Sequence, residues 1–300
     1  MKKILLGTNL KPAMENVLED AYLLAYEFDA EVVPLHVIEH LPYYSKKQET
    51  SFLHSALLKR ITKVQDDLVL KNILVADPVI REGKPCTELL NSVEELDCDL
   101  LMIGSGHSQG VHGLGESANK ILRQAKVPVW LSHPDVSVEN YNHIICAVDF
   151  SYHSKKTLKT AVLMARAFNA ELTILHVAQE MALYPGLTEE GVFVSNWGSH
   201  VYSVPFYEGE GLEREKQRLK EMDRGEMDEF IADINLEGVS YHHEIRYGLT
   251  YKEVLASVKE HQAGLLVIGS HGRGGFFERL LGGTIEKILG NLTSTLLVVT

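Results

Sequence analysis

The chain has 300 residues, 45% hydrophobic and 23% charged, which is an ordinary composition for a folded protein with room for two domains of about 150 residues. Its 41 acidic and 29 basic residues give a net charge of −12, which argues against binding to nucleic acid or anionic lipid as a main activity. Three scattered cysteines without C-x-x-C spacing indicate neither a disulfide framework nor a zinc site.

No apolar run reaches the roughly 20 residues that a membrane-spanning helix needs. The first residues lead directly into a short strand-like segment rather than into the apolar region of a signal peptide. We therefore expect a cytoplasmic protein that neither enters a membrane nor binds nucleic acid.

The first half of the chain alternates between apolar runs and amphipathic segments. Residues 3–8 are almost continuously apolar, which is typical of a strand buried on both faces of a parallel sheet. Residues 13–28 then follow the 3.6-residue period of an amphipathic helix. We predict further strands at residues 32–38, 73–81, 100–104 and 127–131.

The second half of the chain repeats the first. Residues 3–37 align without a gap onto residues 143–177 at an offset of 140, with 11 of 35 positions identical. Residues 81–104 align onto residues 246–269 at an offset of 165, so the second copy carries 165 − 140 = 25 extra residues between the blocks. Such self-similarity indicates a duplicated domain.

The second copy also predicts its own elements. A helix is expected at residues 156–168, and a charged amphipathic helix at residues 212–231. Strands that alternate with helices predict an α/β fold with parallel sheets, whose ligands bind beyond the carboxyl ends of the strands where the strand order reverses. The expected domains are residues 1–137 and 138–300. The predicted strands are residues 144–149, 172–178, 240–247, 265–269 and 295–300.

The most specific local pattern is a glycine-rich segment in the second copy. An apolar strand runs into a loop with spaced glycines, and a glycine pair opens a short helix at residues 285–289. Glycines let main-chain amides approach a ligand, and the free amides of a helix start favour an anion such as phosphate. The alternative is that these glycines only make turns. The Walker pattern and a G-x-G-x-x-G after the first strand are both absent from the sequence.

With these motifs the chain resembles the universal stress protein family in its tandem form, over essentially its whole length. Nucleotide-binding members show G-x2-G-x9-G-[S/T] after the fourth strand. The second copy gives Gly269-x2-Gly272-x9-Gly282, with Gly283 in place of the hydroxyl residue and Thr284 one position later. The resemblance implies two tandem Rossmann-like domains of the adenine-nucleotide-binding type, each a five-stranded parallel sheet flanked by helices. It also implies ATP in the second domain, with Mg²⁺ left open.

The resemblance extends to residues outside the loop. It implies that Asp149, at the end of the first strand, contacts the nucleoside; the alternative is that Asp149 caps the following helix. Val177 matches the position whose main chain reads adenine. Arg273 either pairs with phosphate oxygens or lies on a solvated face. The expected nucleotide-binding residues are Ala147, Val148, Asp149, Val177, Ile268, Gly269, Gly272, Arg273, Gly282, Gly283 and Thr284.

The first copy departs from this motif. Asn9 replaces the aspartate, His107 replaces the second glycine, and the loop is two residues shorter. Glu116 stands where the phosphate-contacting hydroxyl belongs, and a carboxylate there repels phosphate. We expect no nucleotide in the first copy.

These patterns predict an ATP-binding stress-response protein that is non-catalytic or hydrolyses ATP slowly, because no catalytic base or metal cluster is evident in the sequence. The alternative is a nucleotide-independent interaction protein, which the glycine at position 283 favours. A distant third is a serine hydrolase acting through Ser108, since Gly106-His107-Ser108-Gln109-Gly110 matches G-x-S-x-G.

The assembly is predicted from the two apolar final strands. Residues 127–131 and 295–300 are expected to face one another in an intramolecular pseudo-dimer, which would protect an otherwise exposed sheet edge. A further homodimer is left open. The aromatic-rich loop at residues 181–210 is expected to form a lid, a contact between chains or an ordinary loop.

Overall fold

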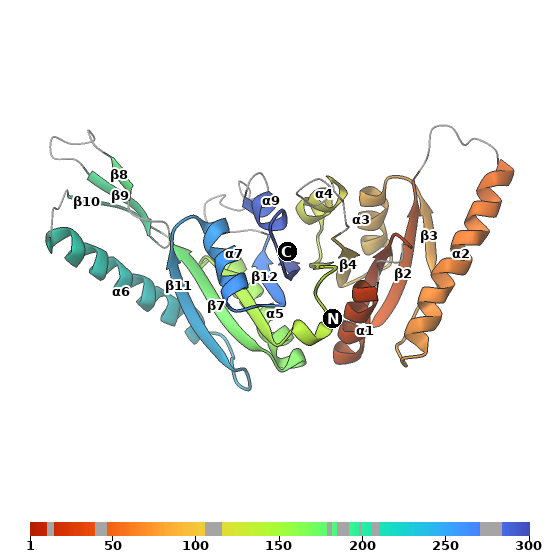
Figure 1. Cartoon of the computed structure of the whole chain (residues 1–300), viewed down its shortest axis with the longest axis horizontal. Helices are drawn as coiled ribbons and strands as arrows, with labels where there is room; N and C mark the ends of the chain where they lie inside the picture. The colour runs from red at the N-terminus through yellow and green to blue at the C-terminus, as the bar shows by residue number, and fades with distance from the viewer. Residues whose placement is uncertain are drawn as a thin grey trace. The chain divides into compact units, whose positions relative to one another are not determined.

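The computed structural model describes residues 1–10, 15–39, 47–105, 116–178, 182–184, 192–197, 200–205, 210–270 and 284–300 (Figure 1). The chain divides into two compact units. The first unit consists of Met1–Tyr141 with Leu289–Thr300, and the second consists of Asn142–Ile288. The domain boundary that we predicted from the sequence repeats, between residues 137 and 138, stays a prediction.

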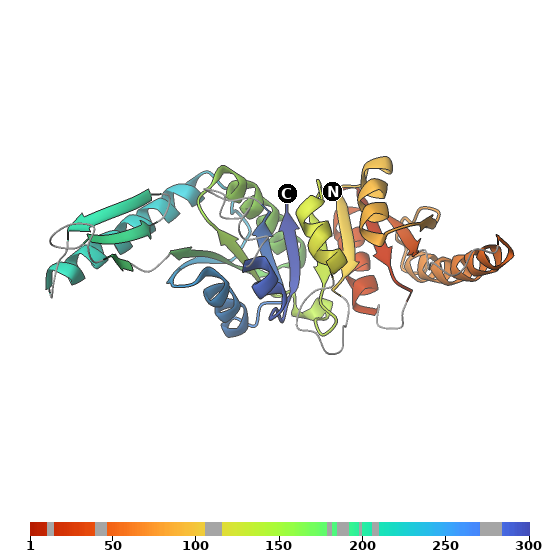
Figure 2. The same ribbon diagram turned by 90° about the horizontal axis from the view of Figure 1, so that it is seen from above.

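The first unit alternates strands and helices as predicted. Its parallel strands lie in the order β5-β4-β1-β2-β3. Figure 2 shows the red helix α1 and the orange helix α3 on opposite sides of these strands, as right-handed crossovers require. The elements are β1 (Lys3–Thr8), α1 (Glu15–Phe28), β2 (Glu31–Ile38), α2 (Lys47–Val69), β3 (Val79–Glu82), α3 (Pro85–Glu95), β4 (Leu100–Gly104), α4 (Glu116–Gln124), β5 (Val129–Ser132) and the 3₁₀ turn Val138–Asn140.

The second unit repeats this pattern with the strand order β11-β7-β6-β12. Figure 2 shows the green helix α5 and the blue helix α7 on opposite sides of the strands. The predicted α/β class, with a mostly parallel sheet flanked by helices, is confirmed. The elements are β6 (His143–Val148), α5 (Tyr152–Phe168), β7 (Glu171–Ala178), α6 (Glu210–Ala232), β11 (Tyr241–Tyr247), α7 (Thr250–Glu260), β12 (Leu265–Gly269) and α9 (Thr284–Leu289).

The insertion between β7 and α6 contains strands that the sequence did not predict. They are β8 (Ala182–Tyr184), β9 (Val192–Trp197) and β10 (His200–Pro205), and they form a separate antiparallel sheet in the order β10-β9-β8. The insertion is therefore not simply an irregular loop, as Figure 1 shows beside α6.

The two units share backbone conformations more strictly than they share side chains. Left-handed backbone is rare outside glycine, and it recurs at matching places in both copies. After the first strand of each unit, Leu10 and Phe150 have φ values of 55° and 59°. At the ends of α1 and α5, Asp29 and Asn169 have φ values of 49° and 51°, which is a common way to end a helix. These positions fix the same chain reversals in both units.

A histidine ties the first two strands of each unit together. His36 Nδ1 lies 2.7 Å from the carbonyl oxygen of Thr8, and His176 Nδ1 lies 2.9 Å from that of Val148. A carbonyl only accepts hydrogen bonds, so Nδ1 carries the proton and donates in both units. We call this bond the histidine latch. It holds the end of the first strand two residues before the left-handed residue.

We expect the latch to contribute measurably to stability. Replacing His176 by leucine removes the donor to the Val148 carbonyl, and we expect the free energy of unfolding to fall by about 1–3 kcal/mol. His153→Leu is the control, because His153 is exposed on α5 and should cost less. Urea unfolding of the two variants makes the comparison. Equal stability of the two variants would show that the latch contributes nothing.

The last strand of the chain lies with the first unit. β13 (Thr295–Val299) pairs antiparallel with β5, with Leu297 opposite Trp130. The predicted contact between the two final strands is therefore confirmed, while the pseudo-dimer as a whole stays a prediction. Because β13 groups with the first unit, the second compact unit ends at Ile288 rather than at residue 300.

A buried polar network joins β13 to the first unit. The Tyr141 hydroxyl lies 2.6 Å from Asp20 Oδ1 and 2.9 Å from Thr295 Oγ1. Trp130 Nε1–H donates to Asp20 Oδ2 at 2.9 Å. Burial raises the pKa of Asp20 to about 6, although hydrogen bonds to its carboxyl group oppose this rise.

Asp20 should therefore make the first unit more stable at mildly acidic pH. Its folded pKa of about 6 lies above the ordinary value of 3.8, so the folded state binds the proton more tightly than the unfolded state. The contribution is present in full below pH 3.8 and is lost as the pH rises through about 6, which amounts to about 3 kcal/mol.

Asp20→Asn should remove this contribution without breaking the network. An amide can accept from Trp130 and donate to the Tyr141 hydroxyl. Urea unfolding of both proteins between pH 4 and 7 isolates Asp20, because other carboxyl groups titrate in both. Parallel stability curves for the two proteins would contradict the assignment.

Candidate functional site

The strand order of the second unit reverses beside β6. β6 is followed by β7 on one side, whereas β12 pairs with its other side, with Val267 opposite Cys146. In open parallel sheets the crevice for a ligand lies at such a reversal, beyond the carboxyl ends of the strands. This edge is where the sequence-predicted residues of the second copy belong.

Three neighbouring strands bring part of the predicted site together. Asp149 follows the last residue of β6, Val177 lies next to last on β7, and Gly269 ends β12. Val148 is opposite His176, so Asp149 and Val177 reach the same edge. The partly exposed members are Ala147, Asp149 and Val177, and the buried members are Val148, Ile268 and Gly269.

Four of the remaining predicted residues lie outside the described residues. This holds for the loop residues Gly272, Arg273, Gly282 and Gly283, and Thr284 is the first residue of α9. In the first copy, His107 and Ser108 likewise lie outside the described residues, and Glu116 begins α4. The predicted roles of these residues stay predictions.

Asp149 organises the start of α5. Its Oδ1 accepts hydrogen bonds from the Ser151 main-chain N–H, at 3.1 Å, and from the Ser154 hydroxyl. Ser151 is the residue that caps the helix, because its hydroxyl accepts from the Ser154 N–H at 3.1 Å. The carboxylate therefore forms the turn before the helix rather than its cap.

An aromatic stack holds the residue that follows Asp149. The buried Phe150 ring lies 4.0 Å from the His176 ring, centroid to centroid, with an interplanar angle of 23°. Phe230 of α6 lies 5.5 Å from Phe150 on a tilted plane. Packing of this kind stabilises the left-handed backbone of Phe150, which would otherwise cost of order 1–3 kcal/mol.

The described polar groups of the site bond to one another and to the main chain. Asp149 holds Ser151 and Ser154, and His176 holds the Val148 carbonyl. These bonds fix the main chain at the end of β6 and the start of α5. Among the described residues, no group of three or more His, Cys, Asp or Glu side chains is arranged to hold a metal ion. Within the same residues, no helix combines the length and apolar character needed to cross a membrane.

The matching place in the first unit is built differently. Asn9 follows β1, and the Leu10 N–H donates to Thr8 Oγ1 at 3.0 Å. Arg60 of α2 donates to the Leu10 carbonyl oxygen at 2.6 Å. An arginine therefore meets the left-handed residue of the first unit, whereas Phe230 meets that of the second.

Sequence analysis did not assign roles to His176, Phe150 or Phe230. The available signal was the Leu-His-Val triplet, which is identical in the two copies at residues 35–37 and 175–177. The left-handed backbone of Phe150 could not be predicted, because no sequence pattern indicates this conformation at a phenylalanine. Its stacking on α6 also depends on tertiary packing.

Comparison with known proteins agrees with the duplicated fold. "Universal stress protein YxiE" of Bacillus subtilis is 32% identical over 161 residues, which are 53% of this chain and 99% of that protein. A universal stress protein structure from Archaeoglobus fulgidus has a TM-score of 0.68 and 21% identity, and covers 99% of this chain and 96% of its own.

A Pseudomonas aeruginosa PAO1 structure, the functionally unknown protein PA1789, also has a TM-score of 0.68, with 17% identity over 100% of this chain and 92% of its own. At such identities the two structures support the fold alone. The sequence profile of the Universal stress protein family matches residues 1–133 and again residues 140–300. Because these matches span both copies, the chain belongs to the universal stress protein family.

Proposed function

We propose that the second unit binds an adenine nucleotide, with ATP as the ligand, at the carboxyl ends of β7, β6 and β12. The observation that carries this proposal is the half-buried carboxylate of Asp149 at the point where the strand order reverses. Family membership and the glycine spacing after Gly269 support the same ligand.

Asp149 can serve the helix and a ribose at once. A carboxylate has about four lone-pair sites, and the bonds to Ser151 and Ser154 use two of them at Oδ1. These bonds fix the orientation of the carboxylate before a ligand arrives, which lowers the entropy cost of binding. Ribose hydroxyls would donate to the Asp149 carboxylate, and the main chain at Val177 would meet the adenine.

The phosphates belong to the glycine-rich loop that follows β12. Glycines at 272, 282 and 283 would let main-chain amides approach phosphate oxygens, and Arg273 would pair with their charge. ATP supplies its own negative charge for a Mg²⁺ ion, which is commonly held by phosphates and water rather than by a protein cage. The lack of a three-residue metal group among the described residues is compatible with that arrangement.

We propose binding rather than rapid turnover as the activity, in a cytoplasmic stress-response protein. The described polar groups near Asp149 are engaged in holding the turn, and ATP hydrolysis would be slow at most. The first unit would not bind the nucleotide, because Asn9 replaces the carboxylate. An interaction protein that works without nucleotide is the second candidate, which Gly283 favours because it removes the expected hydroxyl.

Removing the carboxylate should weaken nucleotide binding. Asp149→Ala should reduce the affinity for ATP roughly 5- to 150-fold, which corresponds to about 1–3 kcal/mol for lost hydrogen bonds to a charged group. Isothermal titration calorimetry on the wild type and the variant measures the change.

Two control variants separate the proposed role from a structural one. Ser154→Ala keeps the carboxylate but removes one bond that orients it, so it should lose less affinity for ATP than Asp149→Ala does. Asn9→Ala alters the matching position in the first unit and should bind ATP as the wild type does. An equal loss in either control would contradict the role of Asp149. A wild type that does not bind ATP at millimolar concentration would favour the nucleotide-independent candidate.

A further inference from the structure

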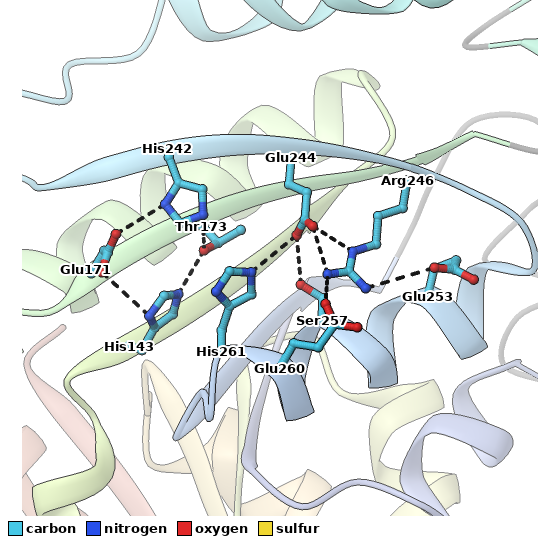
Figure 3. Close-up of polar contacts among 10 residues, drawn as sticks. All are labelled: His143, Glu171, Thr173, His242, Glu244, Arg246, Glu253, Ser257, Glu260 and His261. Atoms are coloured by element: carbon cyan, nitrogen blue, oxygen red, sulfur yellow. Dashed lines mark hydrogen bonds and ion pairs between the residues drawn. The ribbon is translucent and has the colours of Figure 1, made fainter.

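Three histidines of the second unit gather at the edge of the sheet where its parallel strands begin (Figure 3). His143 begins β6, His242 is the second residue of β11, and His261 directly follows α7. The ring centroids of His143 and His261 lie 4.9 Å apart, and those of His242 and His261 lie 5.4 Å apart. We name these three residues the histidine cluster. This edge is opposite to the proposed nucleotide site, so the cluster is independent of it.

Strand β7 connects two members of the cluster. Thr173 Oγ1 lies 2.8 Å from His143 Nε2 and 3.0 Å from His242 Nε2. Glu171 faces the other nitrogens of these rings, with Oε1 3.2 Å from His242 Nδ1 and Oε2 3.8 Å from His143 Nδ1. Figure 3 shows these contacts as a continuous chain across β6, β7 and β11.

Helix α7 connects the third member to β11. His261 Nε2 lies 3.5 Å from Glu244 Oε2, and Arg246 Nε donates to Glu244 Oε1 at 2.8 Å. Burial acts to raise the pKa of Glu244, but hydrogen bonds from Arg246 and Ser257 and nearby positive charge lower it overall, so the carboxylate stays charged. Further contacts of Arg246 are with Glu253 and Glu260.

Three protonated rings would repel one another, although Glu171 and Glu244 would offset part of this repulsion. A protonated histidine carries a positive charge, so protonation of all three rings would place three positive charges within about 6 Å of one another, beside Arg246. The carboxylates that face the rings are Glu171 and Glu244. Burial lowers the pKa of His143; Glu171 opposes this shift, while His261 and His242 add to it. The neutral form of His143 is thus the form that the folded unit favours.

The first unit builds the same place without histidine. Lys3 begins β1 and pairs with Glu31 at 3.3 Å, in the register in which His143 faces Glu171. Leu96 follows α3 where His261 follows α7. Lysine and glutamate keep their charges between pH 5 and 8. The two copies thus differ in side chains that titrate near neutral pH, on an otherwise similar frame.

A metal ion does not account for the cluster. Among the described residues, which include all three histidines, no group of three or more His, Cys, Asp or Glu side chains is suited to hold one. The nitrogens instead face Thr173, Glu171 and Glu244. Proton binding is the chemistry that this arrangement supports.

We propose that the histidine cluster is an acid-sensitive clamp, in which neutral rings hold β11 and the end of α7 against β6 and β7, and protonation loosens them. Among the described strands, β11 lies at the end of the strand order and pairs with β7. The contribution of the clamp is present above pH 6.5 and is lost as the pH falls through the lower folded pKa of His143. The first unit has Lys3, Glu31 and Leu96 at the matching place, so we expect no such loss there.

Hydrogen exchange of the full chain at pH 7.5 and pH 5.5 tests this clamp. We expect the protection of β11 and α7, corrected for intrinsic exchange rates, to fall at the lower pH by at most about tenfold, because pH 5.5 lies one unit below the ordinary histidine pKa of 6.5. Peptides from β3 and α3 of the first unit are the internal control and should keep their protection. Equal changes in both units, or none in β11 and α7, would overturn the proposal.

Two variants and a second measurement make the test specific. His143→Gln keeps a partner for Thr173 but does not titrate, and His261→Leu introduces the residue of the first unit; both should reduce the acid-induced loss in β11 and α7. A loss that is unchanged in both variants would contradict the clamp. NMR titration of the wild type avoids any folding defect, and a His143 that titrates at or above pH 6.5 would also contradict it.

Discussion

The second unit depends on the sharp turn that leaves β6. Because β6 lies between β7 and β12, the chain must leave the sheet at Val148 and begin α5 only a few residues later. Phe150 accommodates this turn with left-handed backbone. The histidine latch fixes the carbonyl before the turn, and Asp149 fixes the helix start after it. The position of the candidate site therefore follows from a constraint on the backbone.

The first unit shows which features the turn after the first strand requires and which side chains can vary there. Leu10 repeats the left-handed backbone, and His36 repeats the latch, yet Asn9 stands in place of the carboxylate. Arg60 binds the Leu10 carbonyl where the second unit uses an aromatic contact. Duplication has kept the frame that turns the chain, while the side chains around it differ. Two units with the same backbone conformation can thus present different side chains. They do so at the carboxyl ends of the strands and at the histidine cluster.

The sequence predicted the regular elements well, because buried parallel strands and amphipathic helices leave strong periodic patterns. Two of the predicted starts of helices and strands differ from the structure for local reasons. β3 begins at Val79 rather than at residue 73, since Pro78 has no N–H to donate to a neighbouring strand. α5 begins at Tyr152 rather than at residue 156, because Ser151 caps the helix.

Other features depend on contacts that no local pattern encodes. The need to cover an apolar edge predicted that the two final strands face one another, but it did not predict that β13 groups with the first unit. The site aspartate could be placed from its position after a strand, whereas the His176 latch required knowledge of the strand register. The histidine cluster was missed for the same reason, since its members come from three elements up to 118 residues apart in sequence (261 − 143 = 118).

The central claim is that the carboxyl edge of β6 in the second unit, and not its counterpart in the first, receives the nucleotide. A crystal structure of the chain grown with ATP tests it most directly. The account predicts one nucleotide per chain, with its ribose hydroxyls within hydrogen-bonding distance of the Asp149 carboxylate and its phosphates at the loop after Gly269. A nucleotide bound beside Asn9, or one in the second unit that does not contact Asp149, would contradict the account.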